Sequence, residues 1–378
     1  MPQLNITIHV RGQAARRVYV EHLAFGVPIG LYITDNQGRV RDNDGNLGIS
    51  SLTANADIRI LGQNSVARIL QGGPAGSSLP LWVDKACTDG VVHNLNTAAE
   101  FEDHFRILNR AVAAYDNVHR QFRPFSGLAD PDFPLGRKPK LDKTKDQSKR
   151  IEIVFPDQLP QPLAFSEPKS LSTGFPLIHV KTNAEDERLF GTGGERPTII
   201  PSELSHALHF SQFTPTGRSR ITIEYVAFIL SNMAGGGPGT HDIGIRTSPL
   251  VAFVEAMDHF SSRFSEFVRT GQSTETGAAL RQAFFRAELA PAGYWFSGPQ
   301  VGTRTGNVVT PAFTGGDDEG AVYGAIFLDF SRRAGMLTAV NAYYVSGALT
   351  FGEYRNWVTA NMPQHAAAIN AVAQTWGL

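Results

Sequence analysis

The chain has 378 residues, 42% of them hydrophobic and 18% charged, which is ordinary for a folded protein of more than one domain. The 34 lysine and arginine residues are balanced by 35 aspartate and glutamate residues, so the basic excess typical of a nucleic-acid-binding protein is absent. The single cysteine, Cys87, excludes an intrachain disulfide and a cysteine-rich zinc site.

The N-terminal residues lack the basic start, the apolar stretch and the small-residue cleavage site of a secretory signal. No apolar run approaches the roughly 20 residues that a membrane-spanning helix needs, so no membrane span is expected. A cytoplasmic location is therefore the expectation, and export by a route without an N-terminal signal stays open as the alternative.

Residues 4–70 alternate apolar and polar side chains in short runs, and this period of two predicts antiparallel strands. Turn-forming sequences at 35–38 (DNQG) and 42–46 (DNDGN) separate the runs. We therefore expect an antiparallel β-sandwich over residues 1–72. The acidic turn at 42–46 also suggests calcium, but it lacks the spaced ligands and closing glutamate of an EF-hand, which favours a hairpin turn.

A Gly/Pro/Ser-rich stretch begins at Gly72, and we expect a linker over residues 73–96. Thr97 followed by Glu100 has the pattern of a capping box, which predicts a helix from Ala98 to about Phe122. Residues 129–150 are rich in proline and lysine. They predict a solvated loop, because no aromatic residues are interleaved with the charges as in a nucleic-acid site.

The rest of the chain predicts a few short strands and then a long series of helices. The expected strands are 150–155, 163–165 and 176–181. The expected helices are 202–210, 221–233, 249–270, 277–288, 319–333, 336–346, 351–361 and a short one after Pro363. An α+β domain over 97–270 and a helical C-terminal subdomain over 271–378 follow from this order.

The most informative motif is Ser202-Glu203-Leu204-Ser205-His206. In an HExxH helix, two histidines four residues apart bind one zinc ion, and the glutamate between them acts on the metal-bound water. Here His206 matches the second histidine and Glu203 the glutamate, but Ser202 occupies the position of the first histidine.

Two later segments strengthen this pattern. Residues 247–260 (TSPLVAFVEAMDHF) match an AWxEGxAxF-like helix, with Glu255 at the glutamate, Phe253 and Phe260 at the aromatic positions and Ala256 where glycine is common. Residues 318–330 (DEGAVYGAIFLDF) have the acidic start of a further helix of this type.

Together these segments resemble the gluzincin type of zinc metallopeptidase over about residues 97–335. The N-terminal region resembles the transthyretin-like and carboxypeptidase-regulatory sandwiches through its strand rhythm and turns. The resemblance implies a zincin-like α+β domain in which His206 and Glu255 are zinc ligands and Glu203 is the general base.

The serine at position 202 changes what this site is expected to do. A neutral hydroxyl is a poor zinc ligand, and His206 with Glu255 supplies two groups where catalytic zinc normally uses three. We therefore predict weak or absent zinc binding. Besides Ser202 itself, the possible substitute ligands are His209, His241 and His259. Each has a structural alternative: a packing histidine, the end of a glycine-rich loop, and a partner for the preceding aspartate, respectively.

Two functions from different classes remain. The first is a pseudopeptidase, a binding or assembly module with a peptide or protein partner in the zincin-like cleft. The alternative is an active zinc-dependent peptidase or hydrolase with a substituted ligand set and Glu203 as general base. Other chemistries fit poorly, because the chain has no P-loop and no GxSxG elbow, and Cys87 is expected to be structural.

Overall fold

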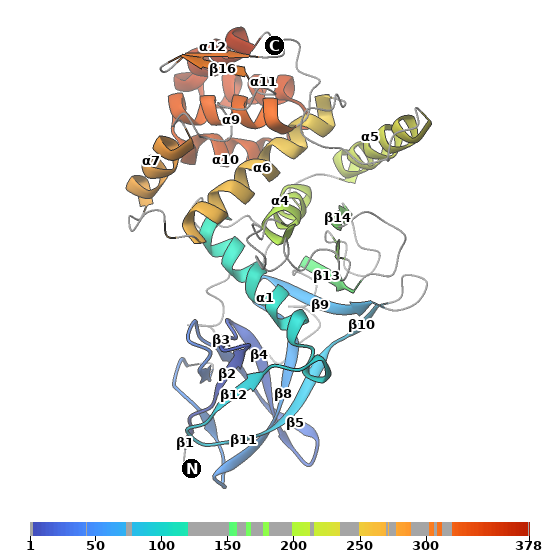
Figure 1. Cartoon of the computed structure of the whole chain (residues 1–378), viewed down its shortest axis with the longest axis vertical. Helices are drawn as coiled ribbons and strands as arrows, with labels where there is room; N and C mark the ends of the chain where they lie inside the picture. The colour runs from blue at the N-terminus through green and yellow to red at the C-terminus, as the bar shows by residue number, and fades with distance from the viewer. Residues whose placement is uncertain are drawn as a thin grey trace. The chain divides into compact units, whose positions relative to one another are not determined.

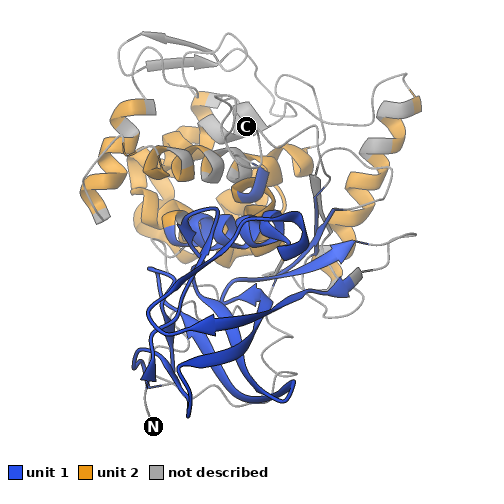
Figure 2. Ribbon diagram, turned by 60° about the horizontal axis from the view of Figure 1, so that its bottom comes forward, with its two compact units in different colours: residues 1–116, 126–200 blue, residues 117–125, 201–378 orange. Residues whose placement is uncertain are grey.

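A computed structural model of the chain describes residues 3–42, 44–72, 78–119, 151–156, 164–167, 177–180, 199–211, 215–234, 249–269, 271, 277–288, 302–305, 308–311, 320–376 and 378. The chain forms two compact units (Figures 1 and 2). Unit 1 comprises Met1–Asp116 and Ser126–Ile200, and unit 2 comprises Asn117–Phe125 and Pro201–Leu378. The described part of unit 1 is mainly strands and that of unit 2 mainly helices, so the predicted order of a β region before a helical region is confirmed.

The first strands of unit 1 come from the segment with the period-two pattern. They are β1 (Gln3–Leu4), β2 (Thr7–Val10), β3 (Gln13–Ala14), β4 (Val18–Ala24), β5 (Val27–Thr34), β6 (Val40–Arg41), β7 (Ile49–Ser50), β8 (Asn55–Asn64) and β9 (Ala67–Gly72). In β8, Ile58 and Ile60 are buried and Asp57 is exposed, as the alternation predicts. The antiparallel pairing of β4 with β5 and β8 is confirmed, whereas the finer prediction of a closed sandwich over 1–72 stays a prediction.

The expected linker over residues 73–96 differs from what the structure shows. Residues 78–95 contain β10 (Ser78–Pro80), β11 (Trp82–Thr88) and β12 (Val92–Leu95). These strands pair with β9, β8 and β2, so they complete the N-terminal sheets. Hydrophobic burial explains why: Val83 and Cys87 point into the core from β11. Burial also raises the pKa of Cys87 to about 12, which fits a structural thiol.

The sheet continues beyond the first 95 residues, in the order β14-β15-β13-β9-β8-β4-β5-β6. β13 (Ile151–Phe155) is parallel to β9 and to β15 (Leu177–Val180), and β14 (Ala164–Glu167) is antiparallel to β15. All three later strands fall at the predicted positions. Because they join the sheet that begins near the N-terminus, the structural boundary does not follow the predicted division at residues 72 and 97.

A helix, α1 (Glu102–Ala114), lies against β8 and β9. The capping interaction is present, since the Thr97 side chain accepts a hydrogen bond from the Glu100 backbone, but it caps a 3₁₀ turn over Ala98–Glu100. Phe101 then adopts φ 53°, so α1 begins at Glu102 instead of Ala98. A π-helical turn over Tyr115–His119 follows α1.

Unit 2 contains α4 (Ile199–Ser211, its first two residues in unit 1), α5 (Pro215–Ala234), α6 (Pro249–Arg269), α7 (Gly277–Glu288), α9 (Gly320–Ala334), α10 (Met336–Ser346), α11 (Phe351–Asn361), the 3₁₀ turn η5 (Pro363–His365) and α12 (Ala366–Trp376). A hairpin of β16 (Gly302–Thr305) and β17 (Val308–Pro311) was not predicted. The core of the unit joins α6, α7 and α9 through T-shaped contacts of Phe260 with Phe284 and Phe327. Among the described helices, none combines the length and apolarity needed to cross a membrane.

Candidate functional site

The helix with the SExxH sequence, α4, is largely buried. Leu204, Ala207 and Leu208 are fully buried, whereas Ser202 and Glu203 are half-buried. Pro201 lies in the first turn of α4, where a missing backbone N–H does not interrupt the helical hydrogen bonds. The helix therefore places positions 202 and 206, one turn apart, on one face.

His206 and Glu255, from α4 and α6, lie side by side. His206 Nε2 is 3.3 Å from Glu255 Oε2, and both side chains are buried. Phe210, one turn after His206, stacks on its ring with centroids 5.8 Å apart and planes 12° apart. The prediction that this histidine and this glutamate come within hydrogen-bonding reach is confirmed.

The second oxygen of the Glu255 carboxylate also has a partner. The hydroxyl of Tyr225, in α5, donates a hydrogen bond to Glu255 Oε1. The carboxylate is thus held between an imidazole of α4 and a phenol of α5. A buried carboxylate needs such partners, because its charge is costly in an apolar environment.

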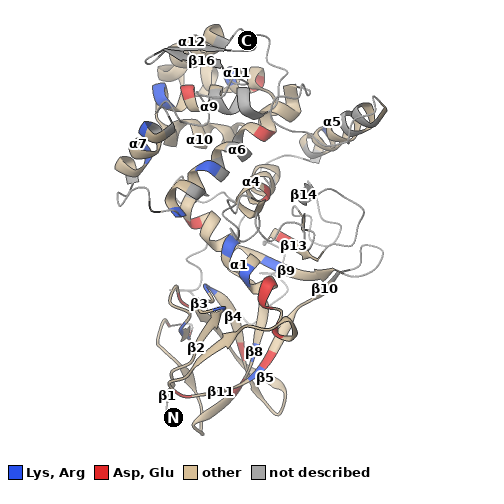
Figure 3. Cartoon of the chain, in the orientation of Figure 1, with Lys and Arg blue, Asp and Glu red and all other residues tan. Residues whose placement is uncertain are grey.

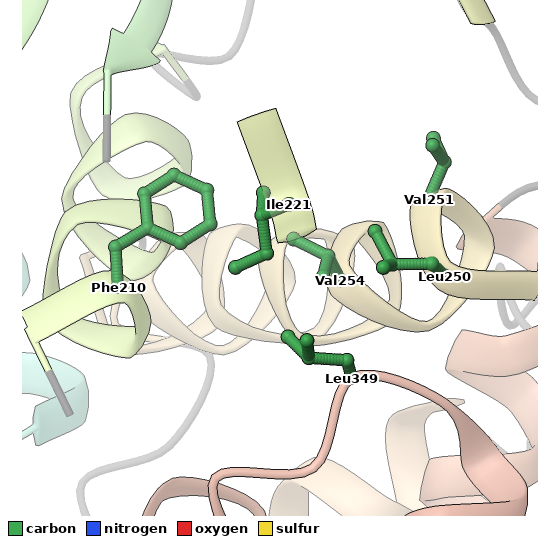
Figure 4. Packing of buried hydrophobic residues seen from close by; sticks show 6 residues of the cluster. All are labelled: Phe210, Ile221, Leu250, Val251, Val254 and Leu349. Atoms are coloured by element: carbon green, nitrogen blue, oxygen red, sulfur yellow. The ribbon is translucent and has the colours of Figure 1, made fainter. Parts of the chain in front are cut away.

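An apolar cluster fixes the three helices that carry these side chains (Figure 4). Phe210 of α4 and Ile221 of α5 lie over Val254 of α6, and Leu349 contacts the cluster from the loop between α10 and α11. Leu250 and Val251 of α6 complete the cluster, and Tyr225 packs against it. This packing sets the positions of His206, Tyr225 and Glu255.

His209 lies one turn beyond His206 in a buried aromatic cluster. Its ring centroid is 4.1 Å from that of Tyr343, and its Nδ1 is 2.9 Å from the Tyr343 hydroxyl. Burial, followed by the nearby His206, lowers the pKa of His209 well below its ordinary value, and a hydrogen bond to the Ala348 backbone offsets this effect in part. A neutral, stacked ring fits the packing alternative for His209.

The remaining sequence candidates have different positions. His241 lies outside the described residues, as does the side chain of His259. From the segment at 318–330, Asp329 is buried in α9 and pairs with Arg332 and Arg333 of the same helix, which gives it a role within that helix. Within the described ranges, no group of three or more His, Cys, Asp or Glu side chains is arranged to hold a metal ion.

The distance between His206 and Glu255 can be compared with the spacing of two ligands on one zinc ion. Two ligands at about 2.05 Å from a tetrahedral zinc ion would lie about 3.3 Å apart. The 3.3 Å between His206 Nε2 and Glu255 Oε2 fits this spacing, and it equally fits a direct hydrogen bond. The neutral hydroxyl of Ser202, on the same face of α4, does not fit as a third ligand. The described donor set is therefore one ligand short of a catalytic zinc site.

Sequence reasoning missed Tyr225 and Tyr343, which hold Glu255 and His209. Neither tyrosine belongs to a motif, because each acts across a helix–helix contact. Comparison of the chain with protein-family models, with curated proteins and with solved structures gives no match.

Proposed function

We propose that the chain is a zincin-like protein with a degenerate zinc site that acts as a binding or assembly module and does not hydrolyse peptides. The observation that carries this proposal is the donor set around the pair: among the described residues, His206 and Glu255 supply two ligands, and no third His, Cys, Asp or Glu side chain joins them. The two side chains are close enough to be each other's hydrogen-bond partners, and Tyr225 donates to the other carboxylate oxygen.

The chemistry of position 202 supports the same proposal. A site with one imidazole and one carboxylate binds zinc far more weakly than a three-ligand site, and Ser202 adds no charge and no imidazole. In this proposal, the contact between His206 and Glu255 links α4 to α6 in the absence of metal. The resembled architecture would then persist as a scaffold for a peptide or protein partner, with the N-terminal β region as a carrier-like sandwich that supplies a second contact.

The alternative is an active zinc-dependent hydrolase with a substituted ligand set. Its support is Glu203, a half-buried carboxylate at the position of the general base. In this case His241 or another group would complete the ligand set, and Glu203 would hold and transfer the proton of the attacking water.

Metal analysis separates the two functions. The full chain is purified without chelator, its zinc content is measured, and hydrolysis of a mixed peptide library is followed by mass spectrometry. The proposal expects less than stoichiometric zinc and no cleavage. One tightly bound zinc ion per chain, with cleavage that Glu203→Gln abolishes, would establish the hydrolase instead.

A further inference from the structure

Three segments of unit 1 meet at one end of the long strand β8. Strands β4 and β5 are joined by a two-residue turn at Phe25 and Gly26, and Leu23 of β4 pairs with Asp57 of β8.

The loop at 51–54 leads directly into β8, and Thr88 at the end of β11 pairs with Asn55. The Asp89 backbone N–H donates to the Ala54 carbonyl at 3.1 Å, which joins the turn after β11 to that loop.

Large apolar side chains are exposed at this end, and we call Phe25, Val27, Ile29 and Leu52 the apolar tip. Their relative exposures are 106%, 61%, 60% and 83%. Phe25 has φ 51°, a left-handed conformation that favours glycine, asparagine or aspartate in a two-residue hairpin turn. A fully exposed phenylalanine in this conformation contributes little to folding, so its presence indicates a role in binding.

The backbone beside the tip is protected against addition of another strand. β6 pairs with β5 through Ile33 and Thr34, so the part of β5 next to the turn lies at an edge of the sheet. Pro28 offers no backbone N–H there, and the pairing of β4 with β5 shifts register between His22 and Leu23. Both features discourage edge-to-edge pairing with a second copy. The tip is therefore suited to binding through its side chains.

Three polar side chains beside the tip, Ser51, Thr53 and Asp89, have hydrogen-bond partners within the unit. The Ser51 and Thr53 hydroxyls donate to the Asn55 carbonyl at 3.2 and 2.6 Å, and the Thr53 backbone N–H donates to Ser51 Oγ. The Asp89 carboxylate accepts from the Asn5 backbone. A protein partner would be met by a rim of polar groups that hydrogen-bond across the interface. A lipid surface instead favours polar side chains that are already hydrogen-bonded within the protein, as these three are.

The absence of charged side chains from the segments of the apolar tip indicates which kind of lipid surface it can bind. Residues 23–30 and 51–55 contain no charged side chain, and the ribbon of this end is drawn in the colour of uncharged residues (Figure 3). Beside these segments, Asp57 follows the loop at 51–54, the Asp89 backbone is hydrogen-bonded to Ala54, and His22 precedes Leu23. No lysine or arginine adjoins the two segments in sequence to attract anionic lipids. An uncharged, apolar end complements the neutral interface of a zwitterionic bilayer.

We propose that the apolar tip inserts Phe25, Leu52, Val27 and Ile29 into the interface of a neutral lipid bilayer, so that unit 1 binds reversibly to membrane surfaces. This inference concerns unit 1 and does not rest on the proposed degenerate zinc site in unit 2.

Flotation with phosphatidylcholine vesicles tests this proposal in the full chain. The natural chain is expected to float with the vesicles, and the combined Phe25→Ser and Leu52→Ser variant to show at least a five-fold lower bound fraction. Leu79→Ser is the matched control, since Leu79 is 66% exposed on β10, which pairs with β9 beyond the other end of β8. It should leave the bound fraction unchanged. Adding phosphatidylserine should not strengthen binding.

A tryptophan reporter provides a second readout that does not depend on loss of binding. In Phe25→Trp, vesicles with brominated acyl chains should quench the added fluorescence, whereas in Leu79→Trp they should not. No flotation of the natural chain, or equal flotation of the serine variant, would overturn the proposal. If the natural chain stays off vesicles but is a dimer by light scattering, and the serine variant is a monomer, the tip binds a second copy instead.

Discussion

His206 Nε2 lies 3.3 Å from Glu255 Oε2, in a contact that joins α4 to α6 in the interior of unit 2. Both side chains are at least nine-tenths buried. Removing one member of a buried pair leaves the other without its partner in an apolar environment, which is more costly than removing both. The contributions of His206 and Glu255 to the stability of unit 2 are therefore expected to be coupled.

A double-mutant cycle measures this shared contribution. His206→Leu and Glu255→Leu should each lower the free energy of unfolding by about 2–5 kcal/mol. The loss of unfolding free energy in the double variant should be smaller than the sum of the two single losses by about 1–3 kcal/mol. The reason is that the second substitution removes a side chain whose partner has already been removed. Urea unfolding at neutral pH is the measurement. The Arg59–Asp84 pair, whose aspartate is half exposed, is the control and should couple by less than about 1 kcal/mol. Additive losses at 206 and 255 would contradict the prediction.

Tyr225→Phe tests the second partner of Glu255. The variant keeps the ring that packs against the apolar cluster and removes the hydroxyl that donates to the carboxylate. A hydrogen bond to a charged group contributes about 1.5–3 kcal/mol, so unfolding should become easier by that amount. Tyr354→Phe is the matched control, because its hydroxyl donates to the neutral Ala339 carbonyl at 3.0 Å and should contribute about 1 kcal/mol. Equal effects of the two substitutions would contradict a stronger, charge-assisted hydrogen bond between Tyr225 and Glu255.

The buried histidine of α1 predicts how the stability of unit 1 depends on pH. Burial lowers the pKa of His104 to about 4, despite opposing effects of the Phe155 backbone and Asp103. The unfolded chain, with a histidine pKa near 6.5, therefore binds more protons than the folded chain between about pH 6.5 and 4. The contribution of His104 to stability should be complete above about pH 6.5 and fall by up to about 3 kcal/mol as the pH decreases through this window.

Thermal unfolding at a series of pH values checks this dependence. His104→Gln, which keeps a hydrogen-bonding side chain and does not titrate, should reduce the slope of stability against pH between about pH 6.5 and 4. The same slope in the natural chain and the variant would show that another group causes the loss at low pH.

Much of the local structure followed from sequence patterns because those patterns report on neighbours in the chain. The helices at 277–288, 336–346 and 351–361 have the predicted bounds, since helical periodicity and end signals lie within each segment. The strands at 78–95 were missed for the opposite reason. The partners of β11 and β12, in β8 and β2, are distant in sequence. β10 pairs with the nearby β9, but the Gly/Pro/Ser stretch between them has the composition of a linker.

The same limit applies to single buried residues. Asn64, to which the sequence patterns assign no role, ends β8, and its amide nitrogen donates to the Leu108 carbonyl of α1 at 2.7 Å. Its side-chain oxygen accepts from the backbones of Val66 and Ala67. In the candidate site, the motif predicted the meeting of His206 with Glu255. The hydroxyl of Tyr225 depends on the packing of α5, for which no sequence signal exists.

Ser202 occupies the position of the first histidine of the resembled HExxH motif, so Ser202→His tests the proposed degenerate site. Position 202 is one helical turn before His206 and is half-buried, so an imidazole there would lie on the same face of α4 as His206. With His206 and Glu255 already at the spacing of two zinc ligands, the variant would have three. Zinc binding should strengthen by several kcal/mol, and zinc should raise the melting temperature of the variant far more than that of the natural chain. Calorimetric titration and thermal unfolding with and without zinc measure both effects. Ser202→Asn, which adds a polar side chain of similar size without an imidazole, is the control and should not respond. If the Ser202→His variant folds and still binds no zinc, then His206, Glu255 and position 202 do not form one ligand set, and the degenerate-site proposal fails.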